Sequence, residues 1–223
     1  MREIVLDTET TGLDPDDGDR IVEIACIELV NHLPTGRFFH RYVNPERPVS
    51  AAAHAIHGLD DAFLAQHSAF AAIAEELLTF IADTPLVAHN AEFDLKFVNA
   101  EMKRLGRPAL ANVVIDTLAL ARKRYPGAQA SLDALCRRFV IDLSARDKHG
   151  ARLDSELLAA VYLELVGGRQ PGLDLAALGG AETQQIAERP VRPPRPHAPS
   201  AEEAAAHAAF LAKIKAPIWN EGS

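Results

Sequence analysis

Two kinds of hydrophobic pattern alternate along the first 168 residues of the chain. Continuous runs of apolar and β-branched residues predict strands that are covered on both faces. Apolar residues that recur every three or four positions predict helices with one buried side. Strands are expected at residues 3–7, 21–30, 37–43, 86–88 and 113–115. Helices are expected at residues 69–82, 91–105, 117–124, 131–139 and 153–166.

The order of these elements predicts the fold class. The first three strands form a meander, with Leu33-Pro34-Thr35-Gly36 as the turn before the third strand and residues 16–19 as a polar loop. The two later strands are separated by helices. An α/β fold is therefore expected, with a mixed five-stranded sheet and helices on both faces. Ser68 and Asn90 are expected to cap the helices that follow them.

The composition changes after Gly167-Gly168, and half of the 14 prolines lie beyond this point. Residues 1–168 are therefore expected to form one folded domain. Residues 169–199 are expected to form an extended, proline-rich linker. Residues 200–223 are expected to form a helical tail, in which Ser200 and Glu203 make a capping box.

The net charge of −8 lies within the first 168 residues, which hold 17 basic and 25 acidic side chains. Proteins that hold duplex DNA along a long surface are usually basic. A nucleic-acid substrate would therefore be contacted over a short length only, and sustained engagement would need a partner protein. The alternative is that the acidic surface only keeps the protein in solution.

Other features favour a cytoplasmic protein. No run of 18 apolar residues predicts a membrane span. The first expected strand begins at residue 3, which leaves no room for a signal peptide. Cys26 and Cys136 lie in apolar segments without a neighbouring cysteine, so both are expected to be buried, reduced thiols.

Four acidic residues, Asp7, Glu9, Asp94 and Asp154, lie near the ends of expected elements. Asp7 and Glu9 are two residues apart on a strand, so they project from one face and would repel each other unless a cation lay between them. Carboxylate oxygens are the ligands that Mg²⁺ and Mn²⁺ prefer. Asp94 and Asp154 could alternatively only complement helix dipoles. The set as a whole predicts a metal-dependent nuclease.

His149 precedes Asp154 by five residues. On one continuous helix the two side chains would point about 140° apart, so the chain must bend if they are to meet. Gly150 supplies freedom for that bend, which places His149 on a loop before the helix. A histidine there is suited to act as a general base that moves toward a metal-held water. The alternative is an ordinary surface histidine, one of nine in the chain.

Three segments carry a resemblance to a known family: Asp7-Thr8-Glu9-Thr10-Thr11-Gly12, His89-Asn90-Ala91-Glu92-Phe93-Asp94 and His149-Gly150-Ala151-Arg152-Leu153-Asp154. They resemble the three motifs of the DEDDh 3′–5′ exonucleases. Ala55-Ile56-His57-Gly58-Leu59 adds a similarity to the proofreading epsilon subunits of bacterial DNA polymerase III. The resemblance covers about residues 3–168 and implies a ribonuclease H-like fold. Over residues 169–223 the resemblance concerns the order of the segments more than the amino-acid sequence.

The resemblance implies a role for each residue that matches a motif. Two divalent cations, Mg²⁺ or Mn²⁺, would be bound by the four carboxylates, and His149 would be the catalytic base. The single-stranded 3′ end of DNA would be held by Asp7, Thr8, Glu9, Leu13, His57 and Asn90. Leu13 would be a wedge beside the terminal base or else turn filler, His57 could be a loop histidine, and Asn90 could do no more than cap its helix.

The tail resembles partner-binding segments. Gln170-Pro171-Gly172-Leu173-Asp174-Leu175 is similar to peptides that bind the sliding clamp, through Gln170, Leu173 and Leu175. Residues 200–219 resemble in placement the segment that binds the polymerase catalytic subunit, with contacts from Phe210, Leu211 and Trp219. A small theta-like accessory subunit is a further possible partner. Two alternatives are a free-standing exonuclease that trims DNA or RNA ends, and a non-catalytic bridging subunit.

Overall fold

The computed structural model of the protein describes residues 1–144, 148–168 and 198–215. The chain divides into two compact units, Met1–Leu173 and Asp174–Ser223. Within the described ranges, no helix is both long enough and apolar enough to span a membrane.

The first unit is built on a mixed five-stranded sheet. Its strands are β1 (Arg2–Thr10), β2 (Ile21–Val30), β3 (Leu33–Tyr42), β4 (Leu86–Ala88) and β5 (Val114–Asp116). Their order across the sheet is β3-β2-β1-β4-β5. β2 is antiparallel to both β1 and β3, whereas β1, β4 and β5 are mutually parallel. The expected mixed sheet of five strands is confirmed.

The turn between β2 and β3 corrects one prediction. Leu33 and Pro34, expected in a turn, pair with Val30 and Leu29 and so belong to β3. The chain reverses instead at Asn31 and His32, whose φ angles are +52° and +66°. Two consecutive left-handed residues match the right-handed twist of a hairpin, and this geometry outweighs the turn preference of proline and glycine.

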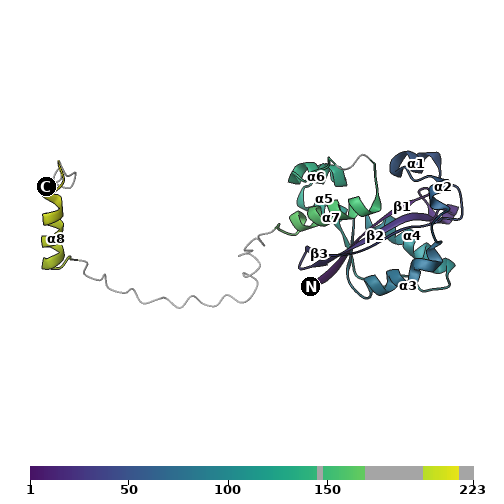
Figure 1. The fold of residues 1–223 in the computed structure, drawn as a ribbon, viewed down its shortest axis with the longest axis horizontal. Helices are drawn as coiled ribbons and strands as arrows, with labels where there is room; N and C mark the ends of the chain where they lie inside the picture. The colour runs from purple at the N-terminus through teal and green to yellow at the C-terminus, as the bar shows by residue number, and fades with distance from the viewer. Residues whose placement is uncertain (145–147, 169–197, 216–223) are drawn as a thin grey trace. The chain divides into compact units, whose positions relative to one another are not determined.

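Helices cover both faces of the sheet, as expected (Figure 1). One face packs against α3 (Phe70–Ile81) and α4 (Ala91–Arg104). The other packs against α5 (Thr117–Arg124), α6 (Leu132–Phe139) and α7 (Ala151–Leu165). The central strand β1 contributes side chains to the hydrophobic cores on both faces of the sheet, because alternate residues of a strand point to opposite faces.

Three short helices were not predicted: η1 (Pro15–Asp17), α1 (Ala51–His57) and α2 (Asp61–Leu64). The sequence of α1 is mostly alanine and has little apolar periodicity. Its start is fixed by Ser50, whose Oγ accepts the N–H of Ala53 over 3.1 Å. The sequence therefore marks α1 by its N-cap residue and not by a hydrophobic pattern.

Two predicted caps differ from the structure. Ala69, not Ser68, is the N-cap residue of α3, and it forms no side-chain capping bond. Asn90 does hold the N-cap position of α4, but in the left-handed region at φ +66° and without a capping bond from its side chain. Its backbone N–H instead donates to Asp116 Oδ1 over 3.0 Å. Asn90 thus joins α4 to the end of β5.

The second unit contains α8 (Ala201–Leu211), which starts at the predicted capping box. Ser200 Oγ accepts the N–H of Glu203 over 3.2 Å, and the N–H of Ser200 donates to Glu203 Oε2 over 2.9 Å. The helix ends at Leu211, and Phe210 is 59% exposed. Gln170, Leu173, Leu175 and Trp219 lie outside the described residues.

Candidate active site

The end of β1 places alternate side chains on opposite sides of the sheet. Val5 packs into the core beneath α6 and α7, so Asp7 and Glu9 point to the same side. Thr8 points the other way, and its Oγ1 donates to Oδ1 of Asp94 over 2.7 Å. This bond ties the first turn of α4 to the strand. Asp94 and Thr8 are both buried, and Asp94 is 3% exposed.

His149 and Asp154 meet at the start of α7. The helix begins at Ala151, and His149 Nδ1 lies 3.3 Å from Asp154 Oδ2. One ligand atom from each of Glu9, His149 and Asp154 lies within 4.8 Å of the others. The predicted bend is present, but Gly150 is extended at φ −162° and ψ 128°, a conformation that any residue can adopt. The start of the helix, rather than the freedom of glycine, makes the bend.

The four carboxylates disturb one another electrostatically. Burial raises the pKa of Asp7 well above its usual value, and Asp94, Glu9 and Asp154 raise it further. Burial and then Asp154 raise the pKa of Glu9 to about 8, although His149 lowers it. Burial raises the pKa of Asp94 to about 7, against the hydrogen bond from Thr8. Buried carboxylates in mutual repulsion fit divalent cations, whose charge would stabilise the ionised forms.

Two clefts reach the carboxylates. The first has a volume of about 300 Å³ and is lined by Asp7, His89, Ser131, Leu132, Asp133, His149 and Asp154. The second has a volume of about 220 Å³ and is lined by Thr8, Glu9, Thr10, Gly12, Leu13, Ser50, Ala52, Ala53, Ile56, His57 and Phe93. The first is mainly polar in its residues, whereas the second also offers apolar walls. Such walls suit the flat face of a nucleobase.

His57 forms part of the wall of the second cleft. It is 6% exposed, and its Nδ1 accepts the N–H of Leu59 over 3.0 Å. Its Nε2 lies 3.3 Å from the carbonyl oxygen of Thr10, which assigns the ring proton to Nε2. Burial lowers the pKa of His57. The ring is therefore a neutral and fixed element of the cleft, rather than the surface loop histidine of the alternative interpretation.

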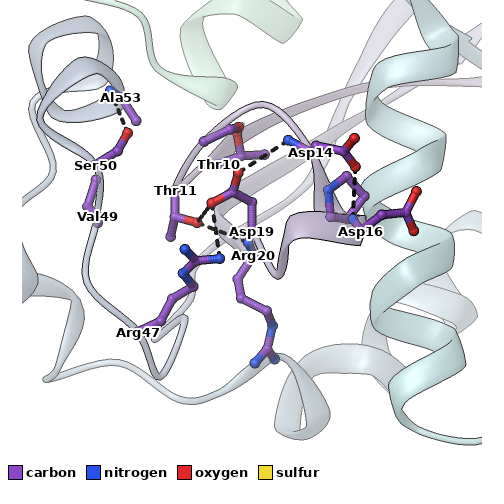
Figure 2. A network of polar contacts seen from close by, with 12 residues as sticks. Thr10, Thr11, Asp14, Asp16, Asp19, Arg20, Arg47, Val49, Ser50 and Ala53 are labelled. Carbon is purple, nitrogen blue, oxygen red and sulfur yellow. Dashed lines mark hydrogen bonds and ion pairs between the residues drawn. The ribbon is translucent and has the colours of Figure 1, made fainter.

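Leu13 lies at the edge of the second cleft and is 82% exposed. Asp19 organises the loop that carries it (Figure 2). The Asp19 carboxylate accepts from Thr11 Oγ1 over 2.9 Å and from the N–H of Asp14 over 3.2 Å. Arg47 lies 3.1 Å from the same carboxylate. Leu13 is therefore an exposed apolar side chain on a loop that polar contacts hold in place.

Gly12 is required by this loop for reasons of space. A Cβ atom at Gly12 would lie 2.2 Å from Asp19 Oδ2, which no side chain could tolerate without moving the carboxylate. The N–H of Ser50 also donates to the carbonyl oxygen of Thr11 over 3.1 Å. The start of α1 and the Leu13 loop therefore form one continuous wall.

Sequence reasoning missed several residues of the site. Ile56 and Phe93 line the second cleft and flank residues that the motifs did identify. Their positions inside the motif segments were the available signal. Asn90, in contrast, is exposed and belongs to the described lining of neither cleft. Phe210 and Leu211 lie in the second unit, on α8.

Comparisons with known proteins agree with this geometry. Residues 4–162 match the RNase_T exonuclease family. The DNA polymerase III subunit epsilon of Rickettsia conorii is 47% identical over 223 residues, covering 96% of each chain. The chain belongs to the DNA polymerase III epsilon family. Membership makes it a 3′–5′ exonuclease of that polymerase, and disfavours the free-standing and non-catalytic alternatives.

Solved structures of other exonucleases extend the comparison from the epsilon family to the fold. Exonuclease X in complex with 5′ overhanging duplex DNA has a TM-score of 0.60 and 28% identity, over 74% of this chain and 90% of that one. The nuclease domain of 3′hExo, a DEDDh family member bound to rAMP, has a TM-score of 0.65 over 74% of this chain and 91% of that one, at 17% identity. The predicted ribonuclease H-like fold is confirmed.

Proposed function

We propose that Asp7, Glu9, Asp94 and Asp154 hold two divalent cations, Mg²⁺ or Mn²⁺. The observation that carries this proposal is the convergence of four carboxylates from β1, α4 and α7. Burial raises the pKa values of Asp7, Glu9 and Asp94, and neighbouring carboxylates of the set raise those of Asp7 and Glu9 further. When bound, such a pair of cations stabilises the attacking and the leaving oxygen of an in-line phosphodiester displacement.

His149 is the catalytic base of the proposed reaction. It accepts a proton from the attacking water, and its place beside Asp154 supports this role. The side chain of His149 is 51% exposed, whereas that of Asp154 is 4% exposed. The base can therefore reach solvent for proton exchange while the metal ligand remains fixed.

The second cleft receives the 3′-terminal nucleotide of a DNA strand. Thr8 and His57 bound the inner part of the cleft, and Leu13 stands at its edge. Asp7 and Glu9 would contribute to substrate binding through the cations that they would hold. Asn90, outside the described lining of both clefts, acts by joining α4 to β5 rather than by touching the nucleotide.

A mismatched 3′ end should be removed faster than a matched one. Leu13 and the second cleft accept a strand end that has left its template, and a mismatched end is released at lower cost. The measurement is the rate of nucleotide removal from matched and mismatched primer–templates at one salt concentration. The same oligonucleotides without template are the control, and should be cut at equal rates. Equal rates on both primer–templates would contradict proofreading.

The residues after Gly168 give the exonuclease its partners in this proposal. Gln170, Leu173 and Leu175 bind the sliding clamp, and Phe210, Leu211 and Trp219 bind the polymerase catalytic subunit. The exposed Phe210 at the end of α8 supports the second contact, because an 11-residue helix that buries none of its described residues gains stability from a partner. The protein then works in the cytoplasm, at the replisome. A theta-like accessory subunit completes the proposed assembly.

Truncation after Gly168 should separate catalysis from assembly. Activity on short single strands should remain unchanged, because the described site lies within residues 1–168. Binding to the polymerase should be lost, because the truncation removes Phe210, Leu211 and Trp219. The exonuclease is then no longer held at high effective concentration near the primer end. Size-exclusion chromatography with the purified polymerase subunit measures this loss.

Point variants distinguish the two tail contacts. Phe210→Ala together with Trp219→Ala should remove polymerase binding and retain clamp binding, since large aromatic side chains usually dominate such interfaces. His207→Ala, also exposed on α8, is the matched control and should retain both contacts. A stable complex between the truncated protein and the polymerase would instead place the contact on the exonuclease domain.

A further inference from the structure

A further carboxylate, Glu23, is buried beside the four acidic residues of the site. It is 3% exposed and lies on β2 directly opposite Glu9 of β1. Both of its oxygens have partners. Oε1 lies 2.7 Å from Nε2 of His40 on β3, and Oε2 accepts the N–H of Ala151 over 3.1 Å. The contacts of Glu23 are thus made with the sheet and with α7.

The contact with Ala151 anchors the start of α7. The first N–H groups of a helix have no partner within the helix, and the N-cap residue Gly150 has no side chain to accept one. Glu23 supplies this acceptor from the neighbouring strand. A negative charge also suits the positive end of the helix dipole. Ala151 is two residues after His149 and three before Asp154, so its position affects both.

The segment that carries His149 is held on two sides. The N–H of His149 donates to the carbonyl oxygen of Ile56 in α1 over 3.2 Å. Glu23 holds the chain two residues later. The His149 side chain is half exposed, so packing restrains it less than it restrains a buried ring. The backbone anchors on either side therefore set where the ring lies.

We propose that Glu23, braced by His40, is a positioning residue that fixes the start of α7 and so places His149 beside Asp154. This inference rests on the proposed role of His149 as the catalytic base. Glu23 acts through the backbone at Ala151 and touches neither substrate nor water in the reaction. Because misplacement of a catalytic group by about 1 Å can cost about 10²-fold in rate, a lost anchor has a measurable effect.

The test is a double-mutant cycle in the full-length protein, with saturating Mn²⁺ and a single-stranded DNA substrate. Glu23→Ala should lower kcat by about 10–100-fold with little change in KM. Glu23→Gln keeps an oxygen that can accept the N–H of Ala151 and should retain most of the activity. In the His149→Ala background, Glu23→Ala should have little further effect, since residues that act as a unit are not additive.

The chain offers a matched control pair and a milder variant. His32 Nδ1 lies 2.8 Å from Oε2 of buried Glu3, whose Oε1 accepts from Tyr162 of α7 over 2.6 Å. His32→Ala therefore disturbs a similar histidine–glutamate pair, which contacts the same helix at Tyr162, 13 residues after His149. This variant should leave kcat unchanged. If Glu23→Ala does not fold, His40→Ala carries the cycle. The His40 side chain is 18% exposed, and its loss removes only the brace of Glu23.

The outcomes separate the inference from the function on which it rests. Full activity of His149→Ala would overturn the role of the base itself. Suppose that His149→Ala lowers kcat and that Glu23→Ala lowers kcat equally in the wild-type and His149→Ala backgrounds. This result would overturn the positioning role of Glu23 but not the role of His149 as the base. The positioning role is also overturned if His32→Ala lowers kcat as much as His40→Ala does, since both effects would then reflect a general loosening of α7. Weaker Mn²⁺ binding in Glu23→Gln would make Glu23 a ligand instead.

Discussion

Replacing Asp7 or Asp154 with alanine should abolish exonuclease activity. Each variant removes one oxygen donor from the group of four carboxylates, and the remaining ligands cannot hold two cations in place. The measurement is the turnover of a labelled single-stranded oligonucleotide in Mg²⁺, with the full-length protein. Comparable turnover of wild type and either variant would reject the assignment of the metal site.

The stability of the same variants is the control for folding. Raised pKa values of Asp7, Asp94 and Glu9 mean that the metal-free folded protein binds more protons than the unfolded chain. The contribution of these three groups to stability is therefore full below about pH 4, near the ordinary carboxyl pKa, and is lost as pH rises toward the Glu9 pKa of about 8. Asp7→Ala relieves part of the repulsion, so its metal-free Tm at pH 8 should equal or exceed that of wild type.

Replacing His149 with alanine should lower turnover by about 10²–10⁴-fold, the usual contribution of general-base catalysis. Mn²⁺ binding should change little, because the four carboxylates remain. In the wild type, turnover should fall in acid, where a protonated imidazole can no longer accept the proton of water. Rates over pH 5.5–8, roughly the range in which histidines titrate, measure this effect.

The exposed histidine of α1 provides the comparison for the His149 variant. His54→Ala should retain wild-type turnover and the wild-type pH profile, since His54 is exposed and is not part of the described lining of either cleft. A flat pH profile of the wild type, or equal losses in both histidine variants, would exclude His149 as the base.

The residues with candidate chemistry could be predicted because they follow strongly patterned elements. Asp7 directly follows a run of four buried residues in β1, and strand alternation alone places Asp7 and Glu9 on one face. The spacing of His149 and Asp154 required a bend, and the structure has one. In both cases the residues are only a few positions apart in the sequence, so the local backbone geometry determines where their side chains lie.

The remaining features depend on contacts between distant residues. Glu23 lies 128 positions before Ala151, and only the pairing of β1 with β2 and the packing of α7 bring them together. The Asn31-His32 turn was missed because the pattern of Pro34 and Gly36 is also compatible with an edge strand. Helix α1 was missed because its sequence is almost free of large apolar residues.

The alternation of side chains along β1 limits how this strand can change in length. Asp7 and Glu9 face α7 while Thr8, between them, bonds to Asp94 of α4, so neighbouring residues serve opposite faces. Inserting or deleting one residue between Arg2 and Asp7 would exchange the two faces of everything beyond it. The number of residues in β1 is therefore constrained as strictly as their identities, and natural length variation in such proteins should be confined to connections outside it.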